Sequence, residues 1–408
     1  MNNLLSLIRS QISPIHIYLY ALIVLPASSF IPIKIGSFAF AVLYLGYKIT
    51  IKGTTNKATK NLLIWLVVWI TLLLTAFLSS ITVTNYNEYH SRALFSYFGF
   101  LLSVFFLLIA VRSKTISLKE LFKAIVYASF IYSVFKTLLI FSTVFGFISV
   151  RALQALIRDF IGSSVVSFWS EDAAIARISF GNDIIIPFVA SFVLLFSDHK
   201  IFSYKFTYLY IIVAMVSTSL GFTRYIWILN AYILVGYIVI VKGNIKIASV
   251  SAFLFTCAYI LILNIDWLNE IINIRSQDST SIDVKNQQAA LLIAEAQNHI
   301  VFGNGLGGYI QTFIRSPYQP YLYEVQWAAL LMQLGVIGLL VLAIGLIFIV
   351  PVSALTLRTS AVKSKEALYL IILYGLWLAS GVTNPYLFIM TSSVSYVLFY
   401  LFFRVKPE

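Results

Sequence analysis

Long apolar stretches separated by shorter polar segments run along almost the whole chain. A bilayer core is about 30 Å thick, and an α-helix needs roughly 20 apolar residues to cross it. Nearly uncharged windows of about that length predict about twelve membrane-spanning helices. The windows lie at 15–31, 33–47, 62–81, 93–111, 124–148, 184–197, 206–222, 225–241, 247–265, 325–350, 367–383 and 386–403. Pro26 and Pro32 crowd the first junction, so the first two windows are either two spans or one hairpin that dips into the membrane.

The composition agrees with this pattern. Apolar residues make up 60% of the chain and charged residues only 11%, which is more apolar material than a soluble core of 408 residues can bury. We therefore expect an all-α polytopic integral membrane protein whose single transmembrane domain covers 1–408. Arg9 is followed by apolar runs without a clear cleavage pattern, so we expect the amino-terminal segment to be retained.

Basic residues indicate how the spans are oriented, because Lys and Arg beside a span resist translocation. If twelve spans alternate, most basic residues fall on one side, and both termini are then cytoplasmic. The net charge of +13 is explained by this topology and does not imply a nucleic-acid partner.

The type of basic residue also differs between the two sides. Of eleven arginines, seven fall outside: Arg92, Arg151, Arg158, Arg177, Arg224, Arg275 and Arg315. Only two lysines, Lys34 and Lys285, join them. Arg grips phosphate or carboxylate through paired hydrogen bonds, so this bias predicts an anion-binding outer face. The alternative is that these arginines pair with outer acids or extend to the membrane interface, and both interpretations stay open.

Two outer segments, 149–183 and 266–324, are long enough to carry function. In the first, RALQALIRDFIG predicts a short amphipathic helix. Arg151 and Arg158 lie two turns apart on one face of it. This helix either rests on the membrane with both guanidiniums directed at headgroups, or simply exposes them to solvent.

The second long segment contains a predicted helix over 283–299, followed by Gly303, Gly305 and Gly307. Glycines allow positive φ and let backbone N–H groups approach a ligand, although such runs also simply end helices. Tyrosines follow in a proline-containing stretch: Tyr318, Tyr321 and Tyr323. They suit stacking on sugar rings, or they form part of the aromatic belt at a membrane surface.

Glu324 stands at the start of the span that begins VQWAALL. Its carboxylate is a candidate general base, with His299 as the runner-up and His90 as a further competitor. The alternative is that the helix dipole alone favours an acid in this place. The outer side shows no Asp-x-Asp or other cluster with clear ligand spacing, so we expect neither a metal nor a cofactor.

Two segments carry a resemblance to a known family. FGNGLGG followed by YEVQWAALLMQLGVIGLL, together with STSLGFTRYIWIL containing Thr223 and Arg224, resembles the O-antigen polymerase and O-antigen ligase superfamily over about 220–340. Ligases of that superfamily typically carry His where this chain has Glu324, and often Asn where it has Val325. The resemblance therefore favours the polymerase branch.

The resemblance implies a GT-C-like fold and a metal-independent glycosyltransferase at the periplasmic face of the bacterial inner membrane. The donor would be an undecaprenyl-pyrophosphate-linked oligosaccharide, and the acceptor a hydroxyl of another lipid-linked repeat unit. Arg224, Arg275 and Arg315 would bind the pyrophosphate, with Arg177, Arg151 and Arg158 as second choices. A chain-length regulator protein is a candidate partner.

Two alternatives remain: an O-antigen ligase, or a flippase or other transporter. Transporters usually bind near the midplane, between two related halves. Here Lys136 is the only clear charge deep in a span, and the polar material is concentrated outside. This distribution favours chemistry at the surface.

Overall fold

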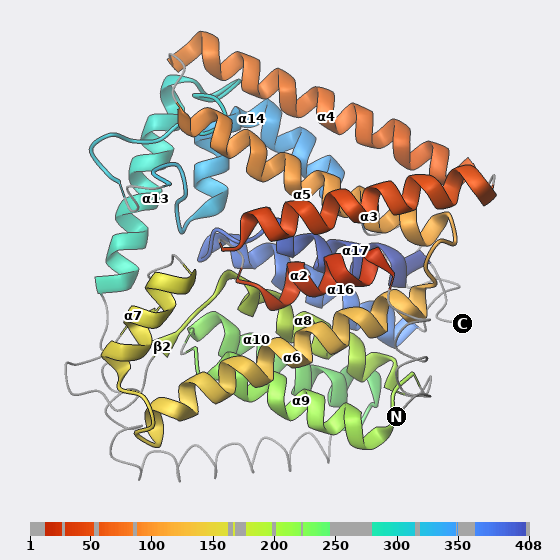
Figure 1. Ribbon diagram of the computed structural model, residues 1–408. Coiled ribbons are helices and arrows are strands. Elements are labelled where there is room, and N and C mark those ends of the chain that lie inside the picture. The colour runs from red at the N-terminus through yellow and green to blue at the C-terminus, as the bar shows by residue number, and fades with distance from the viewer. Residues whose placement is uncertain are drawn as a thin grey trace. The chain divides into compact units, whose positions relative to one another are not determined.

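A computed structural model describes residues 13–26, 29–52, 57–84, 88–161, 166–167, 177–197, 201–221, 223–244, 280–314, 319–347, 349 and 364–404. This part of the chain is predominantly helical (Figure 1). The α-helices are α2 (Pro14–Val24), α3 (Ile31–Lys52), α4 (Lys57–Thr84), α5 (Glu88–Arg112), α6 (Leu118–Val144), α7 (Val150–Ile161), α8 (Ile185–Leu195), α9 (Tyr204–Ser219), α10 (Arg224–Gly236), α13 (Thr280–Asn298), α14 (Gln326–Ile347), α16 (Ser364–Ala379) and α17 (Ser393–Arg404). The shorter elements are β1 (Val166–Ser167), β2 (Arg177–Ile178), the 3-10 turns η1 (Gly181–Ile184), η4 (Ser380–Val382) and η5 (Met390–Ser392), and the π-helical turn η3 (Tyr237–Val241).

Seven helices in the described residues are long and apolar enough to cross a membrane: Ile31–Ile51, Lys57–Leu78, Glu88–Arg112, Leu118–Val144, Arg224–Val241, Gln326–Ile347 and Ser364–Val382. Each overlaps a window predicted from the sequence. Two shorter apolar helices, Pro14–Val24 and Gly181–Leu195, fall in the windows at 15–31 and 184–197. The chain is thus an α-helical membrane protein. The number of twelve spans stays a prediction, and window 247–265 lies outside the described residues.

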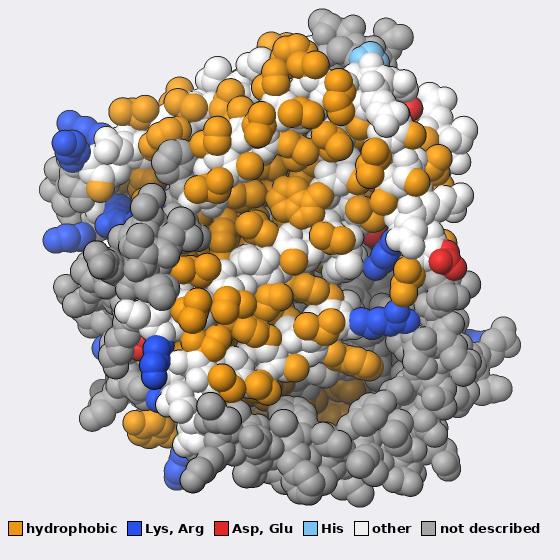
Figure 2. All heavy atoms as spheres, turned by 180° about the vertical axis from the view of Figure 1, so that it is seen from behind, with side chains coloured by type: hydrophobic (Ala, Val, Ile, Leu, Met, Phe, Trp, Pro, Cys, Tyr) orange, Lys and Arg blue, Asp and Glu red, His pale blue; other side chains and the backbone are white. Residues whose placement is uncertain are grey.

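The surface is suited to lipid. Large apolar side chains such as Leu43 and Phe95 are 72% exposed. Figure 2 shows many apolar side chains on the exposed faces of the helices. Soluble proteins rarely expose large apolar patches, whereas lipid tails cover apolar side chains at little cost.

The chain divides into two compact units, and each is described by itself. Unit 1 comprises Met1–Leu63, Val104–Ile233 and Pro407–Glu408, and unit 2 comprises Ile64–Ser103 and Leu234–Lys406. In unit 1, α6 packs against α2, α8 and α9 (Figure 1).

Buried polar contacts gather at one end of unit 1. The Asn182 amide donates to the carbonyls of Ile23 and Leu25 at the end of α2, at 2.7 and 2.8 Å. The next residue, Asp183, accepts a hydrogen bond from Lys136, which lies in the last third of α6. Asp183 is buried, and it pairs with Lys136, the one charge expected deep inside a span. These contacts place the ends of α2 and α6 together with the start of α8.

The amphipathic helix predicted in the first long segment is confirmed as α7. Leu153 and Ile157 are buried on one face, while Arg151 and Arg158 are exposed. The all-α expectation missed a small feature that follows it: β1 and β2 pair antiparallel, with Val166 opposite Ile178. Two residues per strand are too few for a period-2 pattern to be visible in the sequence.

In unit 2, α14 is interrupted at Gly335, whose φ of 63° is non-helical. The glycine segment that follows α13 fills this break. The N–H groups of Asn304 and Gly305 donate to the Met332 and Gln333 carbonyls at 2.7 and 2.9 Å, and Val336 N–H donates to the Ile300 carbonyl at 2.8 Å. An unpaired backbone group at membrane depth costs several kcal/mol, so a broken helix is tolerated only where protein completes it. The glycine segment therefore completes α14.

Gly335→Ala is expected to destabilise unit 2. Alanine at positive φ costs roughly 1–2 kcal/mol, and its Cβ would also overlap the Val301 carbonyl. We expect a clear drop in the thermal unfolding temperature of the purified protein in detergent. The matched control is Gly375→Ala in α16, where an added Cβ meets nothing within 4 Å. If Gly335→Ala and Gly375→Ala unfolded at the same temperature, the conclusion that the glycine segment completes α14 at Gly335 would be wrong.

Candidate functional site

Glu324 lies two residues before α14, and the two residues that follow it are held by hydrogen bonds. Val325 N–H donates to the Gln288 side-chain oxygen on α13 at 2.9 Å. The Gln326 side-chain oxygen accepts from Leu387 N–H at 3.0 Å. Two buried amides from different elements thus fix the position of the carboxylate-bearing residue.

The Glu324 carboxylate pairs with an ammonium group. Lys285 Nζ on α13 lies 3.4 Å from Glu324 Oε2, and it also donates to the Thr383 carbonyl at 3.3 Å. The two charged side chains are 28% and 34% exposed, so a substrate can reach a pair that is still partly sheltered. Lys285 and Gln288 are one turn apart, which puts both on the face of α13 that meets α14.

Sequence reasoning did not identify this pair. Lys285 appeared there only as one of two outer lysines, and Thr383 was given no role. Their separation along the chain from Glu324 leaves no local pattern to find. The detectable signal was the helical spacing of Lys285, Gln288 and Leu292, which marks one face of a helix.

The sequence allows positive φ at Gly303, Gly305, Gly307 and Gly308, and three of these four glycines adopt it: φ is 73° at Gly303, 91° at Gly305 and 84° at Gly307. Their backbone N–H groups were expected to approach a ligand. In the structure, Gly303 N–H donates to the His299 carbonyl at 2.7 Å and Gly305 N–H to Gln333. A Cβ at Gly307 would lie 2.7 Å from the Tyr89 carbonyl oxygen. The glycines thus allow close backbone packing, and the N–H groups of Gly303 and Gly305 have partners within the protein.

Two of the three tyrosines predicted to contact sugar are buried. Tyr321 is 7% exposed and Tyr323 only 1%. Burial raises the pKa of Tyr321, and the charge of Arg92 partly opposes the rise. Burial also raises the pKa of Tyr323, whose hydroxyl accepts a hydrogen bond from Ile310 N–H at 2.7 Å. Neither ring offers an exposed stacking face in this structure.

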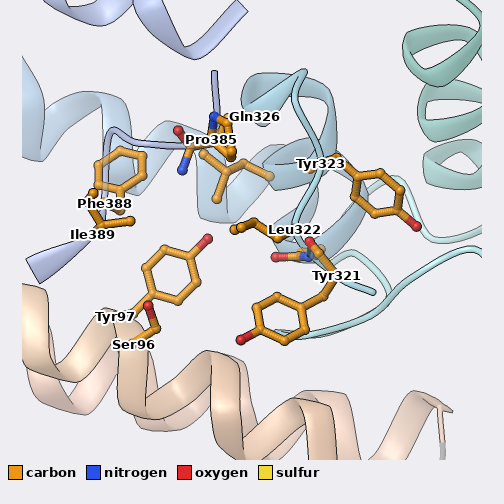
Figure 3. A pocket seen from close by; sticks show the side chains of 12 residues that line it. Ser96, Tyr97, Tyr321, Leu322, Tyr323, Gln326, Pro385, Phe388 and Ile389 are labelled. Carbon is orange, nitrogen blue, oxygen red and sulfur yellow. Dashed lines mark hydrogen bonds between the residues drawn. The ribbon is translucent and has the colours of Figure 1, made fainter. Parts of the chain in front are cut away.

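A small cavity lies beside these tyrosines (Figure 3). Ser96 and Tyr97 of α5 face Tyr321 and Phe388 across it, and the Tyr323 hydroxyl points away from it. Its volume is about 20 Å³, which suits a single water molecule and is far below the size of a sugar site. This cavity is therefore too small to serve as a sugar-binding site.

The remaining predicted residues are distributed between the two units. Arg151 and Arg158 lie on α7, Arg177 on β2 and Arg224 at the start of α10, all in unit 1. His299 follows α13 in unit 2 and is exposed. Arg275, Arg315 and Tyr318 lie outside the described residues. Within the described part of the chain, no three His, Cys, Asp or Glu side chains are grouped so that they could hold a metal.

The fold and the surface together define an α-helical membrane protein with polar clusters at helix ends. No protein-family model matches the sequence, and no curated protein sequence is significantly similar to it. The function is therefore inferred from the site.

Tyr323→Phe is expected to lower stability by about 1 kcal/mol, because it leaves the Ile310 N–H without its partner. The phenylalanine keeps the ring and its packing, so any activity of the protein should persist in the folded fraction. Tyr309→Phe is the matched control, because its ring packs on Tyr89 but no described hydrogen bond is lost. A Tyr323→Phe variant of unchanged unfolding temperature but lost activity would show that the hydroxyl serves chemistry instead.

Proposed function

We propose that the chain is a surface-polysaccharide polymerase of the O-antigen polymerase type. In this proposal it transfers an undecaprenyl-pyrophosphate-linked glycan onto a hydroxyl of another lipid-linked repeat unit at the periplasmic face. The observation that carries the proposal is the Glu324 carboxylate, partly exposed, paired with Lys285 and fixed at the mouth of a membrane helix. The sequence resemblance around Arg224 and Glu324 supports the reaction type.

The proposed topology has twelve spans, with 149–183 and 266–324 as periplasmic loops. The contacts within each unit support alternating spans. In unit 1, the ends of α2 and α6 meet the start of α8. In unit 2, the start of α14 meets the segment between α16 and α17. Alternating spans require both arrangements, because every second junction then lies on the same side.

In the proposed reaction the acceptor hydroxyl oxygen attacks the anomeric carbon of the donor glycan. A new glycosidic bond forms while the bond from that carbon to the pyrophosphate oxygen breaks. The hydroxyl proton passes to the Glu324 carboxylate. The bonding electrons leave with undecaprenyl pyrophosphate, whose charge basic side chains stabilise without a metal. Arg224 is the first candidate for this role from the sequence resemblance.

Lys285 has a defined part in this scheme. Its ammonium offsets the charge of Glu324 and fixes where the carboxylate points. When Glu324 takes the proton, the ammonium is no longer neutralised by its partner and can face the negative charge of the leaving group.

One observation favours a rival class, a flippase or other transporter. Lys136 and Asp183 form a fully buried ion pair, and ionisable residues inside a membrane often mark a transport path. A ligase is the second rival, because it uses the same donor.

Deletion of the gene in its host separates a polymerase from both rivals. We expect surface polysaccharide to lose its ladder of repeat lengths on a gel, while single units attached to the acceptor lipid remain. Loss of those single units as well would favour a flippase or a ligase. An unchanged ladder would overturn the polymerase proposal.

Glu324→Gln keeps the shape of the side chain but removes its basicity. Loss of a general base typically lowers the rate by about 10²–10⁴-fold, so we expect polymer to disappear at normal protein levels. Arg224→Lys keeps the charge but loses the paired hydrogen bonds, and should shorten or reduce the polymer. Glu88→Gln is the matched control, because Glu88 forms only an exposed pair with Arg92 at 3.1 Å. Normal polymer from both site variants would contradict the assignment.

A further inference from the structure

Unit 1 holds a charged group where hydrocarbon would be expected. Lys136, in the last third of α6, is completely buried, and its Nζ donates to Asp183 Oδ2 at 2.7 Å. The same carboxylate accepts from the Tyr132 hydroxyl at 2.7 Å and from Phe180 N–H at 3.0 Å. Three donors on one buried carboxylate form a complete network and not a chance contact.

Stability alone does not explain such a pair. Apolar side chains of similar volume often hold helices together as well as a buried ion pair does. An ion pair differs from apolar packing because its hydrogen bonds form only in a narrow range of geometries. It therefore fixes the positions of the two connected segments relative to each other. The role of this pair therefore depends on which segments it brings together.

Three segments meet at Lys136. The first is α6 itself. The second is the turn from β2 to η1, which carries Asp183 and, three residues before Phe180, Arg177. The third is the turn from α9 to α10: a Cβ at Gly221 would lie 3.4 Å from Lys136 Nζ and 3.5 Å from the Ile178 carbonyl oxygen. Gly221 stands three residues before Arg224.

The third segment is itself held firmly. Asn230 on α10 donates to the side-chain oxygens of Thr218 and Ser219, both at 3.1 Å. Trp227 Nε1 donates to the Ser219 carbonyl at 2.9 Å. The start of α10 is thus tied to the end of α9, and a shift at Lys136 would be passed on to Arg224.

We propose that Lys136 and Asp183 are positioning residues that keep the segments bearing Arg177 and Arg224 in register to bind the pyrophosphate of a lipid-linked donor. They touch no substrate and act through the two arginine-bearing turns. This inference rests on the proposed function for the identity of the anion. That the ion pair fixes the positions of the two turns does not depend on the proposed function.

The decisive variant removes both charges together, Lys136→Met with Asp183→Asn. Either change alone leaves one group buried without its original partner and should reduce the yield of folded protein. The double variant should fold with an unfolding temperature close to that of the parent. Glu88→Gln, which breaks an exposed pair with Arg92, is the matched control.

The first readout is the geometry at Arg224, measured without any substrate. In a Cys257→Ser background with Thr223→Cys, the rate of labelling by a membrane-impermeant maleimide reports the exposure of that turn. We expect the double variant to label about tenfold faster than the parent. Without the charged hydrogen bonds, the turn that carries residue 223 is held less firmly and is exposed more often. Equal labelling rates at equal unfolding temperature would overturn the inference.

The second readout is binding of farnesyl pyrophosphate to the purified protein in detergent. We expect the Kd of the double variant to rise about tenfold, with the Glu88→Gln control unchanged. A parent protein that does not bind this probe would count against the proposed function alone, since the labelling rates still decide the positioning role. Parent-like binding by the double variant would overturn the inference.

Discussion

The structure depends on one constraint: inside a membrane, every backbone polar group and every charge needs a partner within the protein. Two places show how this chain meets it. At Gly335 the helix α14 breaks, and residues 300–305 supply the missing hydrogen bonds. At Lys136 a buried ammonium is matched by Asp183. Each pairing fixes a segment that carries a proposed functional residue, so within each unit the constraint that permits the fold also sets the local geometry around that residue.

The break in α14 determines where Glu324 stands. Because the glycine segment is bonded into the break, the chain between α13 and α14 is anchored at both ends, and α13 packs its apolar face on α14 through Leu292, Ala296 and Met332. The polar residues of the same face then reach the start of α14, where Lys285 meets Glu324. The glycines therefore contribute to the site indirectly, by holding the backbone that presents the carboxylate.

Hydropathy alone predicted the class of protein, and seven of the expected spans appear as long helices, because membrane thickness imposes a length that any sequence must obey. The amphipathic helix α7 and the positive φ of Gly303 were also predictable from local pattern and from glycine's conformational freedom. Contacts between residues that are far apart in the sequence were not predictable. The Lys285–Glu324 contact, the burial of Tyr321 and Tyr323, and the placing of Asp183 beside Lys136 depend on which helices pack together, and a single sequence does not contain that information.

The central claim is that this membrane protein joins lipid-linked repeat units without a metal. It is tested most directly by incubating the purified protein in liposomes with an undecaprenyl-pyrophosphate-linked repeat unit in the presence of EDTA. We expect glycans that lengthen by whole repeat units while one undecaprenyl pyrophosphate is released for each unit added. Repeat units that stay at their original length, with no undecaprenyl pyrophosphate released, would contradict it.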